Sequence, residues 1–320
     1  MLKIACDDGS TNVKLAWLEN GEIKTHLSGN SFKEGWNSAL LGTAKTYNYT
    51  VDGKKYSYDS GSTSAIETRH VSYQYGTANL LAIHHALQTS GLTPQDIEIT
   101  VTLPVTEFFD ADNQPNEKNI ERKKQNVLRA ITLNKGEDFT ITVVNVMPES
   151  IPAALESLTQ DAVMPLERSL IVDLGGTTLD CAIIQGAFEQ ITMIKGNPDI
   201  GTARITKAVI NALNHASTSS SFYVADEIIK NHEDDRFMEA LVNDTHHIKT
   251  IRDVIITESC SLAESVQAAI NDMTAVQRIY LTGGGAEIIY PYIKEHFPNH
   301  KVVKVNNPQF ALVQAMAKAV

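Results

Sequence analysis

The stretch DDGSTNVK at residues 7–14 decides the fold, because it joins the apolar run 2–6 to the apolar run 13–18 through a polar turn that contains a glycine. This arrangement predicts a β-hairpin at the start of the chain. The same order of features returns about half a chain later, where DLGGTT at residues 173–178 joins two further apolar runs. Two similar hairpins predict two similar domains built from strands and helices.

The first turn combines residue types that bind phosphate. Gly9 allows the backbone to turn its N–H groups toward an anion, the hydroxyls of Ser10 and Thr11 add donors, and Lys14 supplies a positive charge. Asp7 is a candidate for holding a hydrated Mg²⁺, which prefers oxygen ligands. Taken alone, the segment fits an ordinary aspartate-rich hairpin turn equally well.

The second turn repeats this chemistry with Asp173, Gly175, Gly176, Thr177 and Thr178. If the two turns face each other across a cleft, they can hold the β- and γ-phosphates of a nucleotide from both sides. Two structural turns that resemble each other by coincidence are the alternative.

A third candidate element is the run Gly283, Gly284 and Gly285, which follows an expected strand at 278–281 and precedes an expected helix. Helix N-termini present free N–H groups and the positive end of the helix dipole, so this run is a candidate nucleotide element. Tight strand–helix packing is the alternative. The chain contains neither a Walker pattern nor an intact dinucleotide-binding fingerprint, which excludes those two classes.

The rest of the chain alternates strand and helix patterns. Asp52 and Gly53 lie between two tyrosine-rich segments at 47–51 and 54–58, and they predict a second hairpin with a two-residue turn. Its tyrosines can face a core or a partner in an assembly. Further expected strands are 97–103 and 143–147, and the expected helices are 78–89, 116–131, 148–158, 205–216, 255–270 and 307–320. The hydroxyl-rich segment 217–221 reads as a solvated loop.

Composition limits the function classes. A chain of 320 residues with 42% apolar residues exceeds one core and favours two domains. The net charge of −11 argues against direct binding to DNA phosphates. No apolar run is long enough for a membrane span and no signal segment opens the chain, so we expect a cytoplasmic protein without membrane contact. We expect Cys6, Cys181 and Cys260 to be free thiols.

Several motifs together resemble the ParM/StbA family of actin-like plasmid segregation ATPases, within the superfamily of actin, sugar kinases and 70-kDa heat-shock chaperones. They are DDGSTN at 7–12, NQPN at 113–116, NIERKK at 119–124, MPESIPA at 147–153, DLGGTTLD at 173–180 and GGGAE at 283–287. The resemblance covers essentially the whole chain. It implies an actin-like (ribonuclease H-like) α/β fold with two domains flanking a nucleotide cleft.

The resemblance also implies domain limits and residue roles. One domain is 1–160 plus 307–320, with an insert at about 31–60, and the other is 166–306. The cofactor would be ATP or ADP with Mg²⁺. By the resemblance, the residues that would contact phosphate are Gly9, Ser10, Thr11, Asn12 and Lys14 in the first turn and Gly175, Gly176, Thr177 and Thr178 in the second. Those that would contact adenosine are Gly283, Gly284 and Gly285. Asp7 and Asp173 would hold the metal and its waters, and Glu149 with Asp173 would position the attacking water. For Glu149, a stabilising acid at a helix N-terminus is the alternative.

By the same resemblance, the protein would hydrolyse ATP, form ATP-dependent dynamic filaments, and segregate plasmid DNA through an adaptor protein bound to a centromere-like site. A small-molecule kinase and a chaperone-like reactivating factor are the alternatives within the superfamily.

Overall fold

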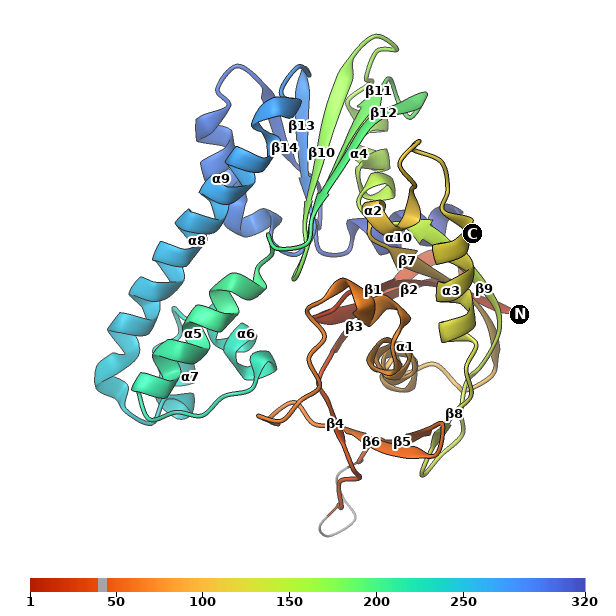
Figure 1. Cartoon of the computed structure of the whole chain (residues 1–320), viewed down its shortest axis with the longest axis vertical. Helices are drawn as coiled ribbons and strands as arrows, with labels where there is room; N and C mark the ends of the chain where they lie inside the picture. Colours follow the sequence, from red (N-terminus) through yellow and green to blue (C-terminus); the bar gives the residue numbers. More distant parts are fainter. Residues whose placement is uncertain (40–44, 320) are drawn as a thin grey trace.

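The computed structural model describes residues 1–39 and 45–319 (Figure 1). Residues 40–44 of the expected insert and residue 320 of the expected last helix lie outside the described residues. The first predicted hairpin is confirmed, since β1 (Leu2–Asp8) and β2 (Asn12–Glu19) pair antiparallel. Consecutive apolar side chains of both strands are buried, because core residues pack on both faces of the pair.

This hairpin forms one side of a five-stranded sheet in the order β3-β2-β1-β7-β9. β3 (Glu22–Gly29) pairs antiparallel with β2, whereas β7 (Asp96–Leu103) and β9 (Thr140–Pro148) add parallel strands beyond β1. Parallel strands need crossover connections. The segments that supply them include α1 (Thr77–Thr89), α2 (Val105–Phe108) and α3 (Glu117–Val127).

The second half of the chain repeats the same sheet. Its order is β12-β11-β10-β13-β14, with an antiparallel hairpin on one side and two parallel strands on the other. The strands are β10 (Arg168–Leu174), β11 (Leu179–Gln185), β12 (Gln190–Asn197), β13 (Arg278–Thr282) and β14 (Lys301–Lys304). The predicted duplication is therefore present in the topology.

Helices cover both sheets and fill the space between them (Figure 1). The second sheet packs against three helices, α5 (Ala203–His215), α8 (Ile248–Ile270) and α9 (Ala286–His296). The smaller helices of this half are α6 (Phe222–Lys230), α7 (Asp235–Leu241) and the 3₁₀ helices η3 (Thr245–His247) and η4 (Asn271–Met273). Between the sheets lie η2 (Ile151–Ala154), α4 (Leu155–Gln160) and α10 (Ala311–Ala319), and α10 packs on β1 and β2. Within the described residues, no helix is long and apolar enough to cross a membrane.

The tyrosine-rich hairpin belongs to a third, smaller sheet with the order β4-β6-β5-β8. Asp52 and Gly53 both have positive φ, 48° and 75°, as the predicted two-residue turn requires. Tyr49 and Tyr56 are buried, so of the two alternatives for these tyrosines the core-facing one holds for this pair. The strands are β4 (Phe32–Glu34), β5 (Asn48–Val51), β6 (Lys54–Tyr58) and β8 (Ile131–Leu133).

Some details differ from the expectations. The helix expected over 116–131 ends at Val127, because residue 131 already pairs with β5 as part of β8. The loop 217–221 is only partly solvated, since Ser217 and Ser219 are exposed but Thr218 and Ser221 are buried. The Ser221 side chain caps α6 by accepting from the backbone N–H of Val224. The three cysteines are free as expected, and Cys260 is only half-buried.

Candidate functional site

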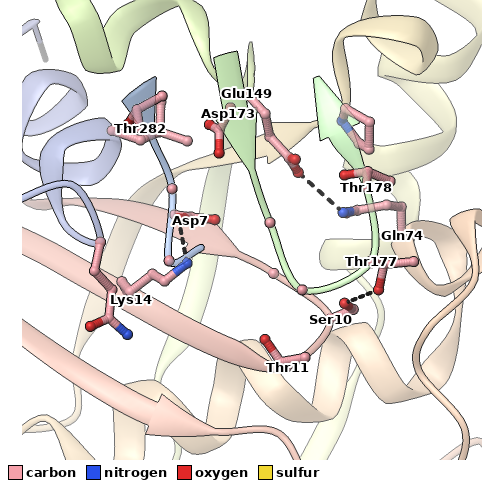
Figure 2. A pocket seen from close by; sticks show the side chains of 18 of the residues that line it. Asp7, Ser10, Thr11, Lys14, Gln74, Glu149, Asp173, Thr177, Thr178 and Thr282 are labelled. Atoms are coloured by element: carbon pink, nitrogen blue, oxygen red, sulfur yellow. Dashed lines mark hydrogen bonds and ion pairs between the residues drawn. The ribbon is translucent and has the colours of Figure 1, made fainter. Parts of the chain in front are cut away.

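The two hairpin turns meet. The hydroxyl oxygens of Ser10 and Thr177 lie 2.6 Å apart although they come from opposite halves of the chain (Figure 2). Gly176 also lies close to Thr11, because a Cβ on Gly176 would lie 2.5 Å from the Thr11 side chain. Glycine is therefore required at this position by close approach.

A cavity of about 700 Å³, part of it open to solvent, lies beside this meeting point. It contains thirteen of the predicted site residues: Asp7, Gly9, Ser10, Thr11, Lys14, Glu149, Asp173, Gly175, Gly176, Thr177, Thr178, Gly283 and Gly284. Asn12 lines an adjoining pocket instead. Among the predicted residues, Gly285 lines neither pocket.

The glycine-rich run allows neighbouring segments to pack closely, and two of its three amide N–H groups are already bonded within the protein. The amides of Gly283 and Gly285 donate to the carbonyls of Pro308 and Leu174, at 3.2 and 2.9 Å. Gly283 has φ of +84°, and a Cβ there would overlap the Asp173 carboxylate. Gly284 has open space around its Cα and lines the cavity. Tight strand–helix packing, the alternative for this run, therefore explains Gly283 and Gly285.

Three side chains hold the first turn from outside. Asn30 Nδ2 and Thr68 Oγ1 donate to the carbonyl oxygen of Ser10, at 3.0 and 2.7 Å, and the hydroxyl of Tyr73 donates to the carbonyl of Gly9 at 3.3 Å. These bonds fix the turn before any ligand binds.

Lys14 forms an ion pair with Asp7 inside the cavity, with Nζ and Oδ2 2.8 Å apart (Figure 2). Burial lowers the pKa of Lys14, but the attraction of the Asp7 carboxylate outweighs it, and the pKa is raised above its ordinary value. The lysine therefore carries its charge at neutral pH.

The carboxyl groups around this pair carry more negative charge than one lysine can balance. Burial, with the nearby charges of Asp180 and Asp7, raises the pKa of Asp173 to about 7. Burial raises the pKa of Asp180 to about 6. Burial also raises the pKa of Glu149 well above its ordinary value, and the neighbouring aspartates add to the effect. The site therefore favours an added cation.

The donor set suits a hydrated Mg²⁺. In the described part of the chain, no three acidic, histidine or cysteine side chains converge on one metal position. Mg²⁺ is usually held by one or two carboxylates, while water and phosphate oxygens complete its shell. Asp7 and Asp173 line the cavity and can supply such contacts.

Glu149 lies at the junction between β9 and η2, as the sequence predicts. Its backbone N–H donates to the carbonyl of Leu103 at 2.8 Å, which extends the pairing of β9 with β7. The next residue, Ser150, has φ of +70°, and the chain turns sharply there. The carboxylate points into the cavity opposite the two turns (Figure 2).

Sequence reasoning missed several buried polar residues next to the site. Asp8 and Lys123 are both fully buried and form an ion pair, and Gln74 lines the cavity. Lys123 looks like part of a charged surface run, Arg122 to Lys124. The available signal was its spacing, because it lies three residues after the buried Ile120 and four before the buried Val127 on one face of α3.

The adjoining pocket extends the cavity toward α5 and α6. It shares Thr11, Lys14, Gly175, Gly176, Gly284 and Gln309 with the first cavity. Its far wall includes Asp226, whose carboxylate accepts a 2.5 Å hydrogen bond from the hydroxyl of Thr206. The two pockets together form one elongated site.

Comparisons with known proteins identify the family of both halves of the chain. A family model described as plasmid segregation protein ParM, N-terminal, matches residues 2–160, and one described as plasmid segregation protein ParM, C-terminal, matches residues 163–319. No curated protein matches the chain at a significant level.

Solved structures show the same fold. A non-polymerisable quadruple mutant of pCBH ParM has a TM-score of 0.71 at 14% identity, with 99% of this chain and 98% of that chain covered. The ADP complex of Ta0583, an archaeal actin homolog, has a TM-score of 0.70 at 18% identity, with 100% and 99% covered. A 15-stranded ParM filament from Clostridium botulinum has a TM-score of 0.68 at 13% identity, with 99% and 98% covered.

These likenesses show an actin-like α/β fold. Since the two family models together account for nearly the whole sequence, the chain belongs to the family of plasmid segregation protein ParM.

Proposed function

We propose that this chain is an ATPase that binds Mg-ATP between its two halves and polymerises into ATP-dependent filaments. The halves are residues 1–160 with 307–320, which carry the insert at 31–60, and residues 166–306. The packing of α10 on β1 and β2 supports the return of the chain end to the first half. The proposal rests on family membership and on the residues that share one cavity.

One observation carries the proposal: two glycine–hydroxyl turns from opposite halves of the chain meet beside a partly buried lysine and three carboxylates. A ligand that contacts both turns needs several acceptor groups close together, and the β- and γ-phosphates provide them. The lysine and the turns bind these phosphates, and the carboxylates require a cation.

Hydrolysis in such a site depends on positioning and electrostatics. The turns hold the phosphates, and Lys14 offsets their negative charge. Glu149 and Asp173 orient the attacking water in line with the γ-phosphate. A bound Mg²⁺ would neutralise charge that develops on the phosphate oxygens.

The adjoining pocket fits the nucleoside. Gly284 leaves space at its entrance, and Asp226 with Thr206 offers hydrogen-bonding groups at its far wall. A carboxylate can accept from ribose hydroxyls or from an exocyclic amino group. ATP or ADP would thus extend across both pockets.

A nucleotide between the halves favours the closed arrangement only by its stronger binding to that arrangement. Loss of the γ-phosphate removes contacts with both turns and allows the halves to relax. Head-to-tail contacts that do not close on themselves give a filament, whose interface fits one arrangement better. With a net charge of −11, the protein would reach plasmid DNA through a DNA-bound adaptor.

Phosphate release and sedimentation test the proposal. The purified protein with Mg-ATP should release phosphate and pellet above a critical concentration, and EDTA should abolish both. A protein that releases no phosphate at tens of micromolar would not be the proposed ATPase. One that hydrolyses ATP but stays monomeric, also with a non-hydrolysable analogue, would retain the enzyme assignment and lose the filament assignment.

A further inference from the structure

We infer that Gln74 is a positioning residue for hydrolysis, which holds the Glu149 carboxylate through its side-chain amide, and that Lys123 and Asp8 fix the orientation of this amide. The inference rests on the proposed ATPase function. It adds three residues to which no role in phosphate or metal binding is assigned.

Gln74 reaches the cavity from the short 3₁₀ helix η1 (Val71–Tyr75), which precedes α1. Its side chain is 5% exposed, so its polar atoms need partners within the protein. Nε2 lies 3.4 Å from Oε1 of Glu149 (Figure 2). This hydrogen bond is long, as catalytic contacts often are before substrate binds.

Lys123 determines which end of the Gln74 amide faces Glu149. Its Nζ contacts Oε1 of Gln74. An ammonium group only donates, so the amide oxygen must face the lysine. The amide N–H₂ is then left to face the Glu149 carboxylate, and the flipped amide would place an acceptor against an acceptor.

Lys123 itself cannot turn away. It is fully buried, and its three donors have three acceptors: Asp8 Oδ2, Gln74 Oε1 and Asn79 Oδ1. Asp8 is also fixed, because it accepts from the backbone N–H of Thr102 at 2.9 Å and from Asn79 Nδ2 at 2.5 Å. Because its charge is paired and all its donors are used, Lys123 holds the Gln74 amide in one orientation.

These contacts fix the orientation of the Glu149 carboxylate. Gln74 Nε2 approaches Oε1 of Glu149 at 3.4 Å. Thr102 Oγ1 lies 3.5 Å from the same oxygen, although its single hydrogen has a nearer acceptor, Asp8 Oδ1, at 3.2 Å. Within residues 1–39 and 45–319, no side chain donates to Oε2. Oε2 is therefore the oxygen that can accept a hydrogen bond from the attacking water.

Two substitutions of Gln74 separate this role from a structural one. Gln74→Glu keeps an acceptor for Lys123 but removes the donor to Glu149, whereas Gln74→Ala removes both. If Gln74 only satisfied Lys123, the glutamate variant would behave like the wild type. We expect both variants to lower the single-turnover rate of ATP hydrolysis by about 10–100-fold, the usual effect of losing a residue that orients a reacting group.

The affinity of the alanine variant for a non-hydrolysable ATP analogue should stay within about threefold of the wild type, because the lost contact acts on water positioning. Gln125→Glu, on the exposed face of α3, is the matched control and should hydrolyse ATP at the wild-type rate. Circular dichroism establishes that each variant is folded.

Wild-type hydrolysis in the glutamate variant would overturn the inference, and so would an alanine variant that loses rate and affinity equally. If the wild-type chain itself releases no phosphate, the proposed ATPase function fails instead. The two failures are therefore distinguishable.

Discussion

The guanidinium carbon of Arg69 lies 3.0 Å from the centre of the Phe222 ring. This contact joins the segment before η1 in the first half to the start of α6 in the second half. Beside it, the hydroxyl of Ser221 donates to the carbonyl of Ser60 at 2.6 Å. The two halves are thus held together at a second place, away from the turns.

Removal of the ring should speed the release of bound nucleotide, because release requires the halves to separate. A cation–π contact contributes about 1 kcal/mol, so Phe222→Leu should raise the dissociation rate of a fluorescent ADP about fivefold. Tyr290→Leu, which removes a cation–π contact within the second half, is the control. Equal dissociation rates in wild type and Phe222→Leu would show that this contact does not limit opening.

Asp173→Ala should impair ATP hydrolysis. Asp173 shares the cavity with Asp7 and Glu149, and its carboxylate is proposed to hold the metal and its waters. A positioned acid–base group contributes about 10²–10⁴-fold to rate, and we expect a loss of this order in phosphate release. Asp199→Ala, at an exposed position, is the control. A turnover rate like that of the wild type would remove Asp173 from the catalytic assignment.

Stability should depend on pH through His85. Burial lowers the pKa of His85 to about 3, and the neighbouring His26 and Lys45 act in the same direction. Its hydrogen bond to the Tyr49 hydroxyl, 3.0 Å long, belongs to the core between α1 and the third sheet. Because the unfolded chain binds a proton below about pH 6.5 and the folded chain does not, the stability contributed by neutral His85 is lost as pH falls from 6.5 toward 3.

The raised pKa values of the cavity carboxylates increase the stability of the fold as pH falls, which opposes the effect of His85. The contribution of His85 is therefore measured as a difference between the wild type and a variant. The difference in free energy of unfolding between wild type and His85→Gln should shrink by about 1.4 kcal/mol per pH unit below pH 6.5. Urea titrations at pH 7.5 and 5.5 measure it. His246→Gln is the control for replacing an exposed histidine. A difference that does not change with pH would mean that His85 is not kept neutral by the fold.

The elements that depend on a local sequence pattern could be predicted from the sequence. The two hairpins were predictable because each turn lies between apolar runs, and their duplication made two matching sheets the natural reading. Asp52 and Gly53 specified their turn through the backbone conformation that glycine accepts. The strand and helix patterns around Glu149 placed it at their junction, whereas its proposed role came from the matching motif.

Features that depend on distant contacts were not predictable. Nothing local to Lys123 indicates that Asp8, Gln74 and Asn79 surround it, since these partners come from other elements. Ser221 looked like a loop residue because its partner at Ser60 lies far away in sequence. The run Gly283 to Gly285 was recognisable, but only the packing of Leu174 and Pro308 shows which amides are already used.

Glu149→Ala should separate nucleotide binding from hydrolysis. The carboxylate faces the cavity but holds water in the proposed reaction, so its loss affects the transition state more than bound ATP. ATP affinity measured by calorimetry should stay within about threefold, and phosphate release should fall by about 10²–10⁴-fold. Since filaments are proposed to weaken only after the γ-phosphate is lost, light scattering should rise on adding Mg-ATP and then persist, whereas the wild-type signal decays as ATP is consumed. A variant that loses ATP affinity would show instead that Glu149 serves binding, and filaments that decay at the wild-type rate would break the link between hydrolysis and disassembly.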